Sequence, residues 1–142
     1  MMDERPGSNF GESAHAMLRV FSALTLMQHG FQKLFGMFGS ERVTNFVSLQ
    51  GVAAFLETFG ALLLLVGLFT RPVAFLLSGE MAVAYFLFHA QRGPIPVVNR
   101  GEVSSLLCFI FFYFLATGGG RYSVDAILRR GRGAVLDSAR AT

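Results

Sequence analysis

The sequence predicts an all-α integral membrane protein: a bundle of four transmembrane helices followed by a short C-terminal interfacial helix. Two observations lead to this class. Hydrophobic residues make up 53% of the 142 residues and charged residues only 15%, whereas soluble domains average about 25% charged residues. The apolar residues also gather in four long segments, most of them near the length that a helix needs to cross a bilayer.

The composition also excludes several kinds of protein. Such an apolar chain is neither disordered nor an ordinary soluble enzyme. The single cysteine, Cys108, excludes an internal disulfide and any metal site built from several cysteines. The net charge of +3 comes from basic residues near the ends of the apolar segments. This placement indicates lipid headgroups as partners and not nucleic acid.

The first apolar segment covers residues 14–35. Acidic residues precede it, Arg19 interrupts it, and no clear small-residue cleavage site follows it. These features are atypical of a cleaved signal peptide. We therefore expect a retained helix.

The second and third segments cover residues 52–69 and 73–90. Each would be about 27 Å long as a helix, close to the roughly 30 Å of a hydrocarbon core. Three residues separate them, and Pro72 suits a first helical turn, so we expect a tight helical hairpin. The fourth segment, residues 103–117, is shorter and needs flanking residues at the interface. The predicted membrane domain is therefore 14–118.

The C-terminal part begins with three glycines that end the fourth helix. Ser123 is a suitable N-cap for a new helix and Asp125 falls in its first turn. We expect residues 119–132 to form the interfacial helix, with Ile127 and Leu128 in the interface and arginines against anionic lipid. Residues 1–13 and 133–142 are expected to be flexible tails. Four residues form a candidate C-terminal motif: Arg121, Tyr122, Ser123 and Asp125, of which Arg121 and Asp125 have i, i+4 spacing.

The distribution of arginines predicts the orientation in the membrane. Seven arginines lie on the side of the two termini, and three lie on the opposite side. Lys33 lies at the end of a helix on that opposite side. The first set is Arg5, Arg71, Arg121, Arg129, Arg130, Arg132 and Arg140, and the second is Arg42, Arg92 and Arg100. Positive loops usually stay inside. We therefore expect a multi-pass protein of a bacterial inner membrane with both termini in the cytoplasm.

Ionisable residues within or beside the apolar segments form a candidate polar cleft. Such groups are costly in hydrocarbon and usually face a bundle interior or an aqueous cavity. The set is Arg19, His29, Lys33, Glu57, Glu80, His89 and Glu102. By depth, Lys33 and Glu57 are the best matched ion pair, and Arg19 is expected to reach Glu80 or Asp125. Two interpretations stay open: pairs that only hold helix register, or a site for a polar headgroup or a proton path.

Two histidines, His29 and His89, are expected at similar depth and suggest axial ligands of a haem. We expect no haem, however, because the nine positions from Glu80 to His89 turn a helix by about 180° and place the two residues on opposite faces. No metal site is expected. A run of phenylalanines in the fourth segment is expected in the core or against lipid, and alternatively as one wall of a quinone pocket: Phe109, Phe111, Phe112 and Phe114.

Several motifs together resemble the DoxX family. Residues 29–36 read HGFQKLFG, like the end of the first helix in that family. The stretches LETFG at 56–60, LFTR at 68–71 and EMAVAY at 80–85 resemble its second and third helices. NRGE at 99–102 and GRYSVD at 120–125 resemble the two ends of its last helix region. The resemblance covers about residues 14–128, and Gly119 departs from it where many members carry proline.

This resemblance implies a four-helix bacterial inner-membrane protein. Some members are linked to quinone-dependent oxidoreductases, including the small subunit of thiosulfate:quinone oxidoreductase, and others to redox-stress membrane complexes. Two functions are therefore expected: a subunit of a quinone-linked complex that binds quinone, or a non-catalytic accessory subunit of a larger membrane complex. The partners would be lipids, other membrane subunits or further copies of the chain. A small transporter is disfavoured by size unless the chain oligomerises.

Overall fold

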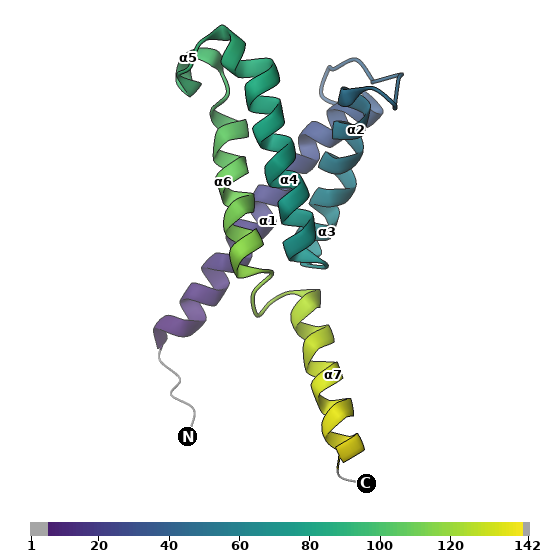
Figure 1. Cartoon of the computed structure of the whole chain (residues 1–142), viewed down its shortest axis with the longest axis vertical. Coiled ribbons are helices and arrows are strands. Elements are labelled where there is room, and N and C mark those ends of the chain that lie inside the picture. Colours follow the sequence, from purple (N-terminus) through teal and green to yellow (C-terminus); the bar gives the residue numbers. More distant parts are fainter. Residues whose placement is uncertain (1–5, 141–142) are drawn as a thin grey trace.

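The computed structural model describes the backbone of residues 6–140 and the side chains of residues 9–132, and within this part every regular element is helical (Figure 1). The first helix is α1 (Pro6–Phe35), and a loop leads to a second rod made of α2 (Leu49–Phe55), η1 (Leu56–Gly60) and α3 (Ala61–Val66). The third rod joins α4 (Thr70–Ala84), η2 (Tyr85–His89) and η3 (Ala90–Arg92). After the short α5 (Pro96–Asn99) come α6 (Glu102–Thr117) and α7 (Val124–Arg140).

The second and third rods form the expected hairpin, but its turn lies at residues 67–69 and not at the predicted 70–72. Gly67, with a φ of +72°, ends α3, and α4 starts at Thr70 with Pro72 in its first turn. Among the described residues, two helices are long and apolar enough to cross a membrane, Leu49–Val66 and Thr70–Arg92. The apolar helix α6 has only 16 residues.

Both ends of the chain are more helical than expected. The predicted flexible tails were 1–13 and 133–142, but 6–13 belong to α1 and 133–140 to α7. Residues 1–5 and 141–142 lie outside the described part of the chain. Contacts explain the start of α1, because the side chains of Asn9 and Glu12 bind Arg121. The helix expected at 119–132 begins at Val124, and α7 runs away from the bundle along its long axis (Figure 1).

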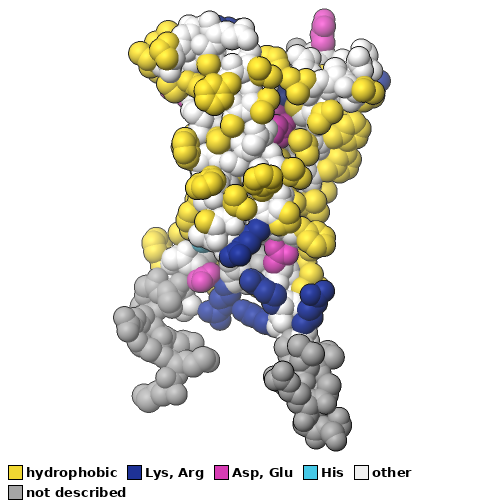
Figure 2. All heavy atoms as spheres, viewed as in Figure 1, with side chains coloured by type: hydrophobic (Ala, Val, Ile, Leu, Met, Phe, Trp, Pro, Cys, Tyr) yellow, Lys and Arg dark blue, Asp and Glu magenta, His cyan; other side chains and the backbone are white. Residues whose placement is uncertain are grey.

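The core is narrow and lies where α1, α3, α4 and α6 meet. Leu26, Leu64, Leu77 and Phe111 are fully buried there, and α4 packs along α6. Most other large apolar side chains point outward and cover the middle of the molecule (Figure 2). A thin core with apolar side chains on the outer surface is typical of a helix bundle that is surrounded by lipid. This packing leaves a polar cavity at one end.

Candidate functional site

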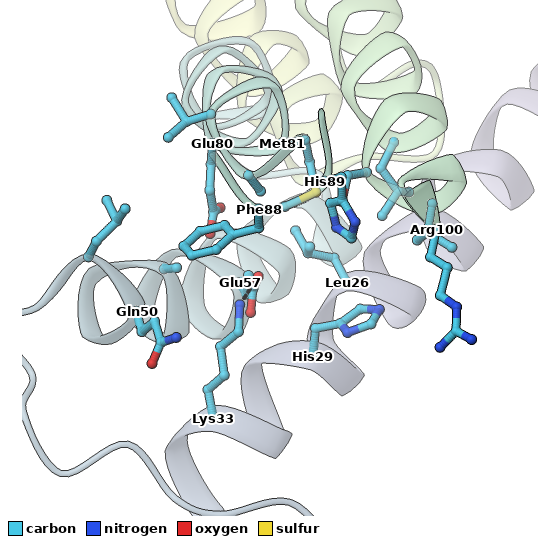
Figure 3. A pocket seen from close by; sticks show the side chains of 17 residues that line it. Leu26, His29, Lys33, Gln50, Glu57, Glu80, Met81, Phe88, His89 and Arg100 are labelled. Carbon is cyan, nitrogen blue, oxygen red and sulfur yellow. Dashed lines mark hydrogen bonds and ion pairs between the residues drawn. The ribbon is translucent and has the colours of Figure 1, made fainter. Parts of the chain in front are cut away.

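A cavity of about 420 Å³ lies between α1, the α2–η1 part of the second rod, the α4–η2 part of the third rod and the start of α6. Figure 3 shows the side chains that line it. Its apolar wall includes Leu26, Met81, Phe88 and Leu107. The ionisable side chains that line it are His29, Lys33, Glu57, Glu80, His89 and Arg100. An apolar chamber of this size with a few convergent polar groups has the usual features of a small-molecule site.

An ion pair lies in the lining of the cavity. Lys33, in the last turn of α1, donates from Nζ to Oε1 of Glu57 at 2.5 Å. Glu57 belongs to the π-helical turn η1 and is only 3% exposed. Close approach of the helices makes the pair possible, because Gly30 lies directly against Thr58 and a side chain there would collide with it. The sequence prediction of a Lys33–Glu57 pair is confirmed.

Unused acceptor atoms also face this space. Both carboxylate oxygens of Glu80 and Oε2 of Glu57 are buried and have no hydrogen-bond partner among the described residues. Figure 3 shows the carboxyl groups of Glu57 and Glu80 extending into the same cavity. Buried polar atoms without partners are uncommon in folded proteins. The arrangement can therefore accept hydrogen bonds from a ligand or from protons carried by the carboxyl groups.

Glu80 and His89 both line the cavity, so the expectation that they face opposite sides was wrong. The helix is π-helical over Tyr85–His89. A π turn accommodates one extra residue, and one residue corresponds to about 100° of rotation. The rotation about the helix axis between Glu80 and His89, about 180° in a regular helix, is thereby reduced to about 80°. His89 is also held by the loop, since its Nδ1 donates to the Asn99 carbonyl at 3.2 Å.

Arg19 lies outside the cavity, contrary to the predicted cleft. It is 3% exposed and donates to the backbone carbonyls of Gly119 and Tyr122 at the far end of the bundle. The expected contacts of Arg19 with the Glu80 or Asp125 carboxylates are therefore replaced by contacts with the chain after α6. Glu102 is exposed in the first turn of α6 and does not line the cavity either.

The C-terminal motif ties the end of the bundle together. Oγ of Ser123 accepts from the Ala126 amide, which confirms the predicted N-cap. Asp125 accepts from the amides of Phe69 and Thr70 at 2.9 and 2.8 Å. Tyr122 contributes its carbonyl to Arg19.

Arg121 precedes the helix and does not contact Asp125 as the i, i+4 spacing suggested. Its amide donates to Glu12 and its guanidinium to Asn9. Partial burial opposes ionisation of Asp125, but hydrogen bonds from the backbone and side chain of Thr70 and from the Phe69 amide, together with the attraction of Arg129, outweigh it and lower the pKa of this carboxyl below its usual value. The charged form of Asp125 is therefore the one that holds α7 to the start of α4.

Sequence reasoning missed several contributors. Arg100, in a left-handed conformation with φ +60°, and Gln50 line the cavity. His15 joins α1 to α6 through the Tyr113 hydroxyl and the Gly118 carbonyl, both at 3.0 Å. Its position four residues before Arg19 was a usable signal, since both lie on one face of α1.

The phenylalanine run of α6 forms no wall of the cavity. Phe111 and Phe114 are fully buried in the core, whereas Phe109 and Phe112 are 73% and 59% exposed. Within residues whose placement is described, no three His, Cys, Asp or Glu side chains gather in a way that could hold a metal ion.

Comparisons with known proteins agree with the resemblance of the motifs. The profile of the DoxX family matches residues 14–90. A protein of Haemophilus influenzae, described as an uncharacterized protein, is 38% identical over 117 residues, which cover 78% of this chain and 87% of the relative. No solved structure matches the chain.

Proposed function

The chain belongs to the DoxX family of membrane proteins, and from this premise we propose that it is a subunit of a quinone-linked redox complex whose cavity binds the quinone head group. In this proposal α1, the two longer rods and α6 each cross a bacterial inner membrane, with both termini in the cytoplasm. The electrons come from a partner subunit, in line with the association of the family with oxidoreductase complexes.

The position of Glu80 opposite the Lys33–Glu57 pair carries this proposal. Reduction of a quinone adds two electrons and two protons, and the protons go to the two ring oxygens. Groups that exchange protons must therefore lie within hydrogen-bond reach of the ring. The Lys33 ammonium can donate to one ring oxygen, and the two carboxyl groups are suited to carry protons toward the other. The side chains of His29 and His89 line the same cavity.

The apolar wall of the cavity suits the ring and the tail of a quinone. Leu26, Met81, Phe88 and Leu107 offer flat or flexible apolar surface for a substituted ring. The cavity volume of about 420 Å³ lies within the range of about 300–1,000 Å³ that is usual for small-molecule sites. Phe88 is also partly exposed on the bundle surface, so a prenyl tail has a route toward lipid.

The test is the quinone content of the full chain purified in mild detergent from its native membrane. Glu80→Gln keeps the shape of the side chain but removes its acid function, and Lys33→Gln keeps a donor but removes the charge. We expect each to lower the bound quinone about tenfold, the effect of losing about 1.4 kcal/mol of binding free energy. Glu102→Gln makes the same chemical change as Glu80→Gln at an exposed site and should leave the content unchanged.

The alternative, a non-catalytic accessory subunit, predicts a different result. In that case large partner subunits co-elute, no quinone is bound to this chain, and the cavity variants keep the quinone-linked activity of the assembled complex. Equal quinone content in all variants would show that any quinone binds elsewhere and would overturn the proposed site.

A further inference from the structure

A second hollow, of about 310 Å³, lies at the opposite end of the bundle, between the start of α4, the end of α6 and the start of α7. Three arginines line it: Arg71, Arg129 and Arg132. Figure 2 shows Lys and Arg side chains gathered at this end, directly below the apolar middle of the molecule. The hollow is thus cationic and lies at the edge of the lipid-facing surface.

The one carboxylate in the lining, Asp125, attracts Arg129, but its two oxygens are already bound elsewhere. Asp125 accepts hydrogen bonds from the amides of Phe69 and Thr70 with its two oxygens. It is therefore already engaged by the start of α4. Arg71 reaches the Ala116 carbonyl with only one of its nitrogens, at 3.2 Å. The remaining guanidinium donors are suited to an anion with several oxygens.

The lining arginines indicate where such an anion would bind. Thr70 is fully buried and lines the hollow, but its hydroxyl interacts with the Asp125 carboxylate and is not counted as a ligand. Arginines bind phosphate through paired N–H donors.

The rim of the hollow favours a lipid over a soluble anion. Phe69 and Leu128 line it and are 62% and 53% exposed, and the neighbouring Ile127 is 67% exposed. An anion with attached acyl chains would cover these side chains. We propose that this hollow is a binding site for the phosphate group of an anionic phospholipid.

Two neighbouring arginines of α7 make a matched test, because Arg129 lines the hollow and Arg130 does not. The measurement is the midpoint of thermal unfolding of the detergent-solubilised full chain with added phosphatidylglycerol or with the zwitterionic phosphatidylcholine. We expect phosphatidylglycerol to raise the midpoint of the unaltered chain and of Arg130→Gln, and phosphatidylcholine to have no such effect. Arg129→Gln should lose most of the rise.

The other outcomes decide against the proposal. If Arg130→Gln loses as much of the rise as Arg129→Gln, α7 is only a basic anchor without a built site. If inorganic phosphate alone reproduces the whole rise, the anion is soluble and the lipid assignment is wrong. Arg132→Gln, at an exposed lining residue, serves as the second variant should Arg129→Gln unfold, and it must also reduce the rise.

Discussion

At the scale of single residues, the Lys33–Glu57 pair is the central interaction of the cavity. The Glu57 side chain is almost fully buried, while that of Lys33 keeps 34% of its surface exposed. A charge in such a place is tolerated only because a partner and hydrogen bonds compensate for the lost hydration. We therefore expect the loss of either partner to lower the stability of the folded protein.

We expect Glu57→Ala to destabilise the protein because it leaves Lys33 unpaired at the edge of hydrocarbon. The cost should lie between about 0.6 kcal/mol, the average for polar contacts in a bilayer protein, and about 3 kcal/mol, the lower value for broken buried pairs in soluble proteins. Reversible unfolding in mixed micelles measures it. The double change Lys33→Met with Glu57→Leu should recover much of the loss. A double variant as unstable as the sum of the singles would argue against coupling.

At the scale of elements, the close packing of α1 against η1 positions that pair. A Cβ added at Gly30 would lie 2.7 Å from the Thr58 backbone nitrogen, and backbone cannot move aside easily. The two rods can approach only because Gly30 has no side chain. Glu57, in the π-helical turn η1, then lies within reach of Lys33.

Gly30→Ala should therefore separate α1 from η1. We expect a loss of about 1–3 kcal/mol, the usual cost of overpacking, together with lower quinone content if the proposed site is correct. Gly79→Ala is the matched control, because a Cβ there meets nothing within 4 Å. That change should be neutral or stabilising by up to about 1 kcal/mol through helix propensity. Equal effects of the two changes would contradict this packing argument.

The docking of α7 depends on the charge of one carboxyl. The pKa of Asp125 is lowered in the folded protein, so the ionised form is the stabilising one. Its contribution is fully present above the pKa of an unfolded aspartate, about 3.9, and is lost as the pH falls through the lower folded pKa.

We expect Asp125→Asn to lower stability at neutral pH by about 1 kcal/mol, a typical value for a lost helix cap. Thermal unfolding of both proteins across a pH series tests this, since the difference between them should vanish in strong acid. Arg130→Gln, on the same helix, provides a control whose effect should not follow this titration. A difference that stays constant down to the lowest pH would rule out the Asp125 charge as its source.

At the scale of the whole molecule, the two ends of the bundle differ in chemistry. One end holds the cavity with its carboxyl groups and histidines, and the other holds the Arg19 contacts and the arginine-lined hollow. An asymmetric distribution of arginines orients membrane proteins. The arginine-rich end, which carries α7, is therefore expected to face the cytoplasm.

Cysteine labelling from each side of the membrane tests this orientation in a Cys108→Ala background. Gln91→Cys, near α5, should react with an impermeant reagent from the periplasmic side only. Gly131→Cys, where an added Cβ meets nothing within 4 Å, should react only after the inner leaflet is made permeable. Reaction of Gln91→Cys exclusively from the cytoplasm would invert the proposed topology.

The sequence by itself determined the all-helical membrane character, the helical hairpin with Pro72 in a first turn, the Ser123 cap and the Lys33–Glu57 pair. These features depend on composition, on local turn chemistry and on the level of a residue along its helix, all of which can be read along the chain. Only the tertiary structure decided which polar groups share a cavity. A π turn rotated His89 toward the Glu80 side, and the chain after α6 took Arg19 away from the predicted cleft. Helix phase and long-range capping follow from packing between distant elements, and no local pattern in the sequence records that packing energy.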